Sequence, residues 1–258
     1  MSVKIDLSGT SAVVFGVANH RSIAWAIAES LYEAGANLTI TYQNERMGKA
    51  ALGLIEDMDR AQGVECDVLN QQMVDSAIAS ASAIAPLKTI VHAVAFANRD
   101  DLAPGVFAST DLEGFRLALE VSAYSLLPIA RSASAAMEDG GSIITLSFQA
   151  AEKVYPGYNI MGVAKAALEN EVRQLASELG TSKVRVNAIS AGPLNTLAGR
   201  GIGGFTEMQE IHASKAPLKR NITHEEVGNT ALFLASQLSS GITGEVIYVD
   251  AGYNIMGV

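Results

Sequence analysis

Two residues able to do hydrogen-bond chemistry, Tyr158 and Lys165, stand seven positions apart. On an α-helix this spacing is a rotation of about 700°, so both side chains would lie on one face, about 10.5 Å apart along the axis. A phenol and an ammonium group in that arrangement could donate a hydrogen bond to a reacting oxygen and orient a bound sugar. The alternative is an exposed tyrosine and an exposed lysine on an ordinary amphipathic helix.

A loop that could meet a phosphate group follows the first apolar run, Ser11–Phe15. A dinucleotide loop needs glycine where the backbone approaches the pyrophosphate, and helix N–H groups that face the anion. The usual G-x-G-x-x-G pattern is absent, but Gly16 is present, and Ser22 at the expected helix start offers a hydroxyl and an N–H. An ordinary strand–helix loop is the alternative.

Two further strand ends carry polar side chains that could bind the adenosine half of a dinucleotide. The second strand ends before Gln43, which is neutral, and the nearest cation that could take a 2′-phosphate is Arg46, three residues on. This favours NADH over NADPH. The third strand ends near Asp67, which could accept a hydrogen bond from an adenine amino group or cap the following helix. Both roles of Asp67 stay open.

Strand-like and helix-like segments alternate along the chain, and these elements must position the polar residues. Such alternation predicts parallel strands joined by right-handed crossovers. We predict a single α/β domain over residues 1–258, a Rossmann-type doubly wound parallel sheet of about seven strands with helices on both faces. A flexible loop over the substrate is expected at about 194–210, which is rich in glycine and has no period. Strands are expected at 11–15, 37–42, 63–68, 88–96, 141–147, 184–190 and 245–250, and helices at 22–34, 45–59, 70–82, 111–137 with a break at Pro128, 158–179 and 225–235.

The composition excludes several classes of protein. The chain has 258 residues, 49% of them hydrophobic, and its formal net charge of −9 argues against nucleic-acid binding. Cys66 is the single cysteine, so an intrachain disulfide is impossible. We expect no signal peptide, no membrane span and a cytoplasmic location. The sequence indicates no metal site, and His92, at the end of an apolar strand, is expected to be structural.

Seven motifs occur in order with natural spacings. They are Gly16 to Ala24, Tyr42-Gln43, Cys66-Asp67-Val68, His92 to Ala97, Tyr158 to Lys165, Asn187 to Pro193 and Thr196-Leu197-Ala198. Together they resemble the NADH-dependent enoyl-acyl carrier protein reductases of bacterial fatty-acid synthesis, a divergent branch of the short-chain dehydrogenase/reductase superfamily. The resemblance covers nearly the whole chain.

The resemblance implies that NADH reduces a trans-2-enoyl thioester of acyl carrier protein or coenzyme A, the last step of the elongation cycle. Tyr158 would hydrogen-bond the developing enolate oxygen, and Lys165 would hold the nicotinamide ribose hydroxyls. A homotetramer and an acyl carrier protein partner are implied as well. The implied cofactor contacts are Gly16, Ser22, Ile23, Gln43, Asp67, Val68, Val94, Lys165 and Thr196, and the implied substrate contacts are Ala95, Phe96, Phe148, Tyr158, Met161, Leu197, Ile202 and Phe205.

The place of the tyrosine differs from that in common short-chain dehydrogenases, which carry it four residues before the lysine to protonate a carbonyl. Met161 occupies that position here, and no Tyr-x-x-x-Lys occurs in the chain. On a helix, Tyr158 would lie about 4.5 Å farther back. A displaced phenol suits an enoyl thioester, whose charge develops on an oxygen beyond the carbon that accepts the hydride. The spacing therefore favours reduction of a C=C bond over reduction of a ketone.

Three positions depart from the common family pattern. Phe148 stands where most members have a second tyrosine, although a long-chain branch also carries phenylalanine, and Ala95 stands where many members have glycine. Basic residues that follow the loop in some members are absent from residues 203–207, so an acidic carrier would have to meet other cations. A ketone or hydroxysteroid reductase and a non-catalytic dinucleotide-binding regulator are the alternative functions. The cations left near this end of the chain are Arg200, Lys215, Lys219 and Arg220.

Overall fold

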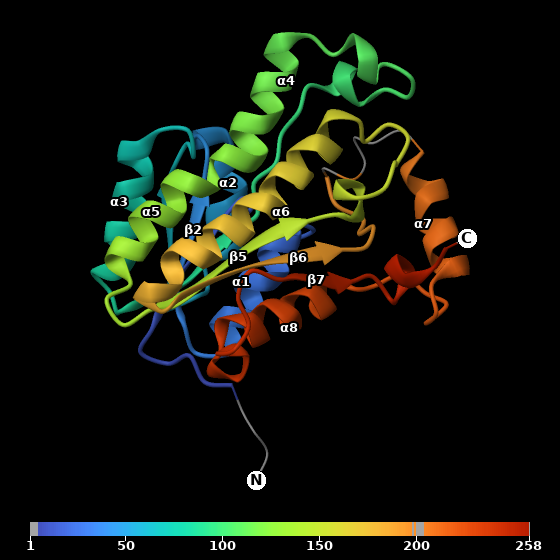
Figure 1. The fold of residues 1–258 in the computed structure, drawn as a ribbon. Helices are drawn as coiled ribbons and strands as arrows, with labels where there is room; N and C mark the ends of the chain where they lie inside the picture. The colour runs from blue at the N-terminus through green and yellow to red at the C-terminus, as the bar shows by residue number, and fades with distance from the viewer. Residues whose placement is uncertain (1–4, 198, 200–203, 258) are drawn as a thin grey trace.

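The architecture is that of a computed structural model, which describes residues 5–197, 199 and 204–257. Seven parallel strands form one sheet in the order β3-β2-β1-β4-β5-β6-β7 (Figure 1). The chain runs outward from β1 to β3 and then returns to place β4 beside β1, which is the switch point of a doubly wound sheet. This confirms the predicted fold class. The strands are β1 (Ser11–Phe15), β2 (Asn37–Tyr42), β3 (Ala61–Glu65), β4 (Leu87–His92), β5 (Gly141–Ser147), β6 (Val184–Ala191) and β7 (Val246–Val249).

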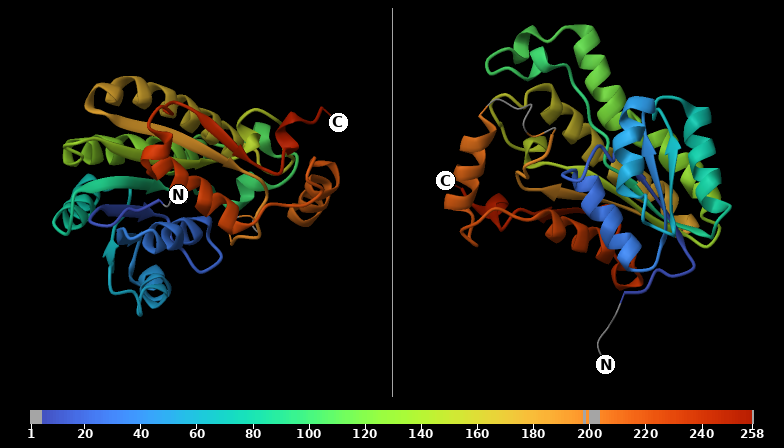
Figure 2. Two further views of the ribbon diagram at one scale, coloured as in Figure 1. Left: turned by 90° about the horizontal axis from the view of Figure 1, so that it is seen from below. Right: turned by 180° about the vertical axis from the view of Figure 1, so that it is seen from behind.

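Helices cover both faces of the sheet (Figures 1 and 2). Side chains of α1 and α8 pack in one apolar core, and those of α3, α5 and α6 pack in a second. Successive strand residues point to opposite faces, so Val14 joins the first core while Val13 and Phe15 join the second. The helices are α1 (Ile23–Glu33), α2 (Glu45–Leu54), α3 (Gln71–Ser82), α4 (Leu112–Leu119), α5 (Leu126–Ala136), α6 (Ile160–Leu179), α7 (Phe205–Lys215) and α8 (His224–Ala235).

Several predicted bounds need correction. The helix expected at 45–59 ends at Leu54, the strand expected at 88–96 ends at His92, and the strand expected at 63–68 lies earlier, at Ala61–Glu65. The helix break predicted at Pro128 lies instead in a π-helical segment, Glu120–Tyr124, between α4 and α5. Pro128 falls in the first turn of α5, where the missing N–H of proline costs little.

The end of the predicted loop at 194–210 is also corrected, because residues from Phe205 onward form α7. His212 is the one fully buried residue of this helix, so α7 lacks the apolar stripe by which a helix is found in a sequence. In space α7 lies beside the C-terminal residues, at one end of the sheet (Figure 1). There the N–H of Leu218 donates to the carbonyl oxygen of Ala251 over 3.2 Å.

Candidate active site

Tyr158 lies in a turn just before α6, so the prediction that it shares a helix face with Lys165 is wrong. Asn159, between Tyr158 and the helix, has φ 42° and ψ −117°, which no helix accommodates. Its side-chain amide anchors the turn by donating to the carbonyl oxygens of Asp101 and Ala103, over 2.9 and 2.7 Å. Helical bonding begins immediately afterwards, where the N–H of Met161 donates to the Tyr158 carbonyl oxygen over 3.0 Å.

The structure nevertheless places both side chains at the carboxyl end of β5. The Nζ of Lys165 donates to the carbonyl oxygen of Leu146, in β5, over 2.7 Å. The ring of Tyr158 packs on Phe148, the residue after β5, with 5.1 Å between ring centroids. The carboxyl ends of parallel strands are where such sheets bind ligands. That these two groups serve one site stays a prediction, now without the shared helix face.

Burial shifts the pKa values of Lys165 and Tyr158 in opposite directions. Lys165 is buried, and burial lowers the pKa of its ammonium group to about 8, although Glu169 one helical turn away partly opposes the shift. Glu169 is itself buried and accepts a hydrogen bond from the Ser147 hydroxyl over 2.5 Å. Burial also raises the pKa of Tyr158 above its ordinary value of 10. At neutral pH the site thus holds a protonated phenol that can donate.

A second phenol, which the sequence patterns did not single out, stands on the other side of Phe148. The ring centroid of Tyr155 lies 4.7 Å from that of Phe148. Its hydroxyl donates to the Gln149 side-chain oxygen over 2.6 Å and lies 3.2 Å from Nε2 of His212, on α7. Burial lowers the pKa of His212 to about 4, so the imidazole is neutral at pH 7. The one sequence signal for Tyr155 and Gln149 was their closeness to Tyr158.

A cavity of about 480 Å³ opens between this aromatic group, α7 and the C-terminal residues. It adjoins Phe148 only through Tyr155, whose ring packs on Phe148 and lines the cavity. None of the predicted substrate residues that the structure describes lines this cavity, and Ile202 lies outside the described residues. The lining includes Tyr155, Pro156, Met208, Ile211, His212 and Met256.

The predicted substrate residues are spread around the same end of the sheet. Met161 is buried, with its sulfur 3.7 Å from the Ser122 hydroxyl, and Phe205 packs against the backbone of Gly199. Phe96 and Leu197 are more than half exposed. Ala95, also exposed, comes just before Phe96 in the segment that follows β4.

Most predicted cofactor residues follow strand ends along the same edge. Gly16 comes after β1 with φ +97°, and a Cβ there would lie 2.2 Å from the carbonyl oxygen of Ala93, so no other residue fits. Ser22 caps α1 by accepting from the Trp25 N–H, and Ile23 is the first residue of the helix. Gln43 is exposed directly after β2. The loop after β1 and the start of α1 therefore lie at the switch point of the sheet, between β1 and β4.

The remaining cofactor residues settle one open alternative. Asn70 caps α3, whereas the carboxylate of Asp67 accepts from the N–H of Leu69 over 3.0 Å. The capping role considered for Asp67 is therefore wrong, and its adenine role stays a prediction. Val68 is buried, Val94 is half-buried beyond β4, and the Thr196 hydroxyl accepts from the Gly199 N–H over 3.0 Å.

Two other side chains have structural roles. The ring nitrogens of His92 lie 2.9 and 2.7 Å from the hydroxyls of Thr145 and Ser125, and burial lowers its pKa to about 3, which confirms the structural expectation. Burial raises the pKa of the Cys66 thiol to about 12, so the thiolate is absent at neutral pH. Among the described residues, no group of His, Cys, Asp and Glu could hold a metal ion, and no helix is long and apolar enough to cross a membrane.

Comparison with known proteins identifies the family. A sequence profile of the family described as Enoyl-(Acyl carrier protein) reductase matches residues 16–254. The chain belongs to this family. The site geometry described above is therefore that of an enoyl-acyl carrier protein reductase with phenylalanine at position 148.

Individual members of the enoyl-acyl carrier protein reductase family align over nearly their full length. The NADH enoyl-acyl-carrier-protein reductase of Nostoc sp. is 49% identical, covering 98% of this chain and all of its own. That of Bacillus cereus is 46% identical over 97% of this chain and 99% of its own. The crystal structure of the Bacillus cereus enzyme with NADP⁺ and indole naphthyridinone has a TM-score of 0.95 at 45% identity, covering 99% and 100% of the two chains. The Anaplasma phagocytophilum enzyme with NAD has a TM-score of 0.93 at 42% identity, covering 100% and 98%.

Proposed function

We propose that this enzyme reduces the C2=C3 double bond of trans-2-enoyl thioesters with NADH, the last step of fatty-acid elongation. The observation that carries the proposal is the position of the Tyr158 phenol, packed on Phe148 at the end of β5, with Lys165 bonded at the same strand end. Met161, where ketone reductases carry their tyrosine, is buried and has no acidic hydrogen to give. This arrangement supports enoyl reduction over ketone reduction.

When bound, NADH supplies a hydride to C3 of the enoyl thioester. Tyr158 donates a hydrogen bond to the thioester oxygen, where negative charge develops, and its raised pKa keeps the proton on the phenol. The resulting enolate takes up a proton from water at C2, so that one hydride and one proton together saturate the double bond. Lys165 holds the ribose hydroxyls through its Nζ, which the Leu146 carbonyl oxygen already orients. Phe148 supports the Tyr158 ring and excludes water from it.

The cofactor residues fit a dinucleotide along the carboxyl edge of the sheet. Gly16 allows the loop after β1 to approach β4 closely, which leaves the N-terminus of α1 free for the pyrophosphate. Gln43 and Asp67 follow β2 and β3 and serve the adenosine half. Because Gln43 is neutral, NADH is preferred to NADPH. Val68, Val94 and Thr196 complete the cofactor contacts.

The acyl chain extends from Tyr158 into the cavity of about 480 Å³ beneath α7. Gly204 and the α7 residues Glu207, Met208, Ile211 and His212 line this cavity. The flexible substrate loop at about 194–210, and substrate contacts by Ala95, Phe96, Met161, Leu197 and Phe205, remain part of the proposal. The single sheet with its two cores supports the prediction of one domain. The thioester comes from acyl carrier protein or coenzyme A, and we place the enzyme in the cytoplasm as a homotetramer.

Loss of NADH absorbance with three substrates tests this function. Crotonyl-coenzyme A is expected to be reduced to butyryl-coenzyme A, with no oxidation of NADH in the absence of a thioester. Acetoacetyl-coenzyme A serves as the ketone control and is expected to be inert. Reduction of the ketone alone would indicate another short-chain reductase, and binding of NADH without any turnover would indicate a regulator.

A further inference from the structure

His224, the first residue of α8, reaches the loop before α1, although its partner there lies 203 positions away in the sequence. Its Nε2 lies 2.9 Å from the carbonyl oxygen of Arg21. A carbonyl oxygen can only accept, so Nε2 carries the hydrogen and donates. Arg21 directly precedes Ser22, the N-cap of α1. The imidazole therefore holds the peptide group at the start of α1, the helix whose N-terminus the proposed function assigns to the pyrophosphate.

Arg21 belongs to a turn whose other polar groups are satisfied locally. The N–H of Arg21 donates to the Asn19 side-chain oxygen over 2.8 Å, and the Ser22 hydroxyl donates to the Asn19 carbonyl oxygen over 2.7 Å. The same Ser22 oxygen accepts from the Trp25 N–H over 3.3 Å. These short-range bonds shape the turn but do not tie it to the rest of the molecule. The hydrogen bond from His224 connects the turn to α8.

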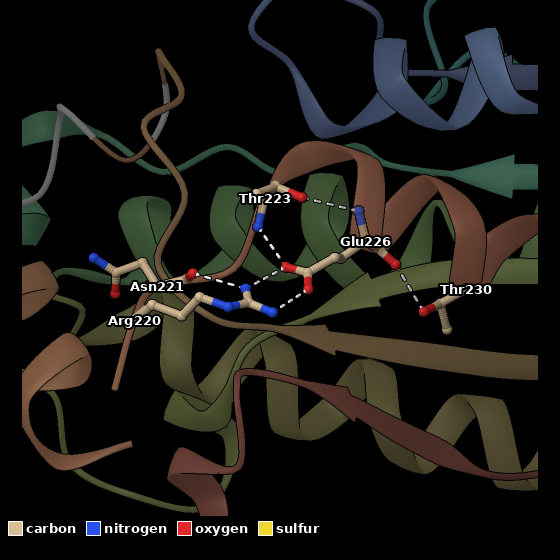
Figure 3. A network of polar contacts seen from close by, with 5 residues as sticks. All are labelled: Arg220, Asn221, Thr223, Glu226 and Thr230. Carbon is tan, nitrogen blue, oxygen red and sulfur yellow. Dashed lines mark hydrogen bonds and ion pairs between the residues drawn. The ribbon is translucent and has the colours of Figure 1, made fainter. Parts of the chain in front are cut away.

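The helix that carries His224 is firmly held in two ways. It packs closely on α1, because a Cβ at Gly228 would lie 2.4 Å from the Ser30 hydroxyl oxygen. Its N-terminus is clamped by the ion pair of Arg220 and Glu226, with contacts of 2.6 and 2.9 Å (Figure 3). The Thr223 hydroxyl accepts from the Glu226 N–H, while the Glu226 carboxylate accepts from the Thr223 N–H (Figure 3). His224 thus projects from a rigid support.

We propose that His224 is a positioning residue for NADH: its hydrogen bond fixes the Arg21–Ser22 peptide so that the first N–H groups of α1 point at the pyrophosphate. This inference rests on the proposed function only in placing the pyrophosphate at α1. His224 acts through the backbone of Arg21 and does not itself touch substrate or cofactor.

The test compares three variants of the enzyme with the wild type. His224→Leu keeps the bulk and removes the donor, whereas His224→Gln restores a donor on a side chain of similar reach. Asn229→Ala, an exposed position on the same helix, is the matched control. Dissociation constants for NADH are measured by fluorescence titration, together with KM for NADH, KM for crotonyl-coenzyme A, kcat and the melting temperature.

The leucine variant is expected to bind NADH about 3- to 10-fold more weakly, the effect of losing one neutral hydrogen bond. Its KM for NADH should rise in parallel, while kcat and KM for the thioester at saturating NADH change less. Glutamine should recover most of the affinity. If the leucine variant does not fold, His224→Ala carries the same test, since alanine suits a helix start.

Wild-type affinity in a folded donor-less variant would overturn the inference, as would equal weakening by leucine and glutamine. A fall in kcat with unchanged NADH affinity would also overturn it. Failure of the wild-type enzyme to bind NADH would instead contradict the proposed function, and the inference with it. Active wild type with an unaffected leucine variant contradicts the inference alone.

Discussion

At the scale of single residues, burial sets the chemistry of the site. It keeps the Tyr158 phenol protonated and brings the pKa of Lys165 down to about 8, close to working pH. The residue types and their order along the chain predicted this pair, whereas the backbone between them could not be predicted. The positive φ of Asn159 is accompanied by hydrogen bonds to two carbonyl oxygens of a distant segment, those of Asp101 and Ala103, 58 and 56 positions away.

Replacement of Tyr158 by phenylalanine isolates the role of its hydroxyl. Tyr158→Phe removes the hydrogen bond to the developing oxyanion but keeps the ring that packs on Phe148. We expect kcat to fall about 100-fold or more, with less than a twofold change in the dissociation constant for NADH. Steady-state kinetics and fluorescence titration measure both quantities. Tyr124→Phe, at an exposed tyrosine, should behave as wild type. Normal turnover of Tyr158→Phe would refute the assignment.

Replacement of Lys165 should act mainly on the cofactor. Lys165→Ala removes a charged donor to the ribose hydroxyls, so NADH binding is expected to weaken about tenfold or more. The variant also leaves the Leu146 carbonyl oxygen without this donor, so its melting temperature must be recorded beside its affinity. Lys49→Ala, an exposed lysine on α2, is the control. NADH affinity equal to wild type in a folded Lys165→Ala protein contradicts the role given to Lys165.

At the scale of elements, the local sequence was sufficient to predict a strand or helix where its apolar pattern and its capping residue indicate the same element. β1, β2 and β5 follow their apolar runs, and Ser22 marks the start of α1 as its side chain suggests. Other elements, such as α7, depend on tertiary contacts. The start of α7 has no side-chain cap, and the helix is held by contacts such as His212 stacked on Tyr253, 3.6 Å between centroids. Those partners lie 41 positions apart in sequence, so no local pattern could show them.

The clamp at the start of α8 should make stability depend on pH in acid. Hydrogen bonds from Arg220 and from the Thr223 N–H hold the pKa of Glu226 at about 2, against its ordinary 4.5. The unfolded chain binds the proton first as pH falls, so this contribution is complete above about pH 4.5 and disappears toward pH 2. Because the pair is partly exposed, we expect Glu226→Gln to lower the free energy of unfolding at pH 7 by only about 1 kcal/mol.

Urea unfolding of wild type and Glu226→Gln at a series of pH values measures this difference. It is expected to be constant near neutrality and to shrink between about pH 4.5 and 2. Glu225→Gln, one residue earlier and exposed, is the matched control and should show little effect. A difference that persists undiminished at the lowest pH would mean that the charge of Glu226 is not its source.

At the scale of the whole molecule, alternation of strands and helices predicted the parallel sheet, and its right-handed crossovers left few possible strand orders. The position of the site followed, because the polar residues after β1 to β6 share one edge. The cavity could not be predicted from this alternation. It is built by Tyr155, Met208 and Met256, which come from three distant parts of the chain and meet only after folding.

Assembly is a further property at this scale. Ile255 and Met256, near the C-terminus, are 74% and 41% exposed in the single chain, which is a costly place for large apolar side chains unless a second copy covers them. We expect sedimentation to give a tetramer, and Ile255→Ser to shift it toward smaller species. Ile84→Ser, at an exposed isoleucine of the loop after α3, should leave the assembly intact. A wild-type monomer at micromolar concentration would contradict the proposed assembly.

The central claim, that the hydride goes to a C=C bond, is tested most directly by following the hydride itself. The enzyme is given crotonyl-coenzyme A and NADH that carries deuterium at the transferable position, and the product is analysed by mass spectrometry and NMR. The account predicts butyryl-coenzyme A with one deuterium on C3. Deuterium on a hydroxyl-bearing carbon from acetoacetyl-coenzyme A, with no labelled butyryl product, would contradict it.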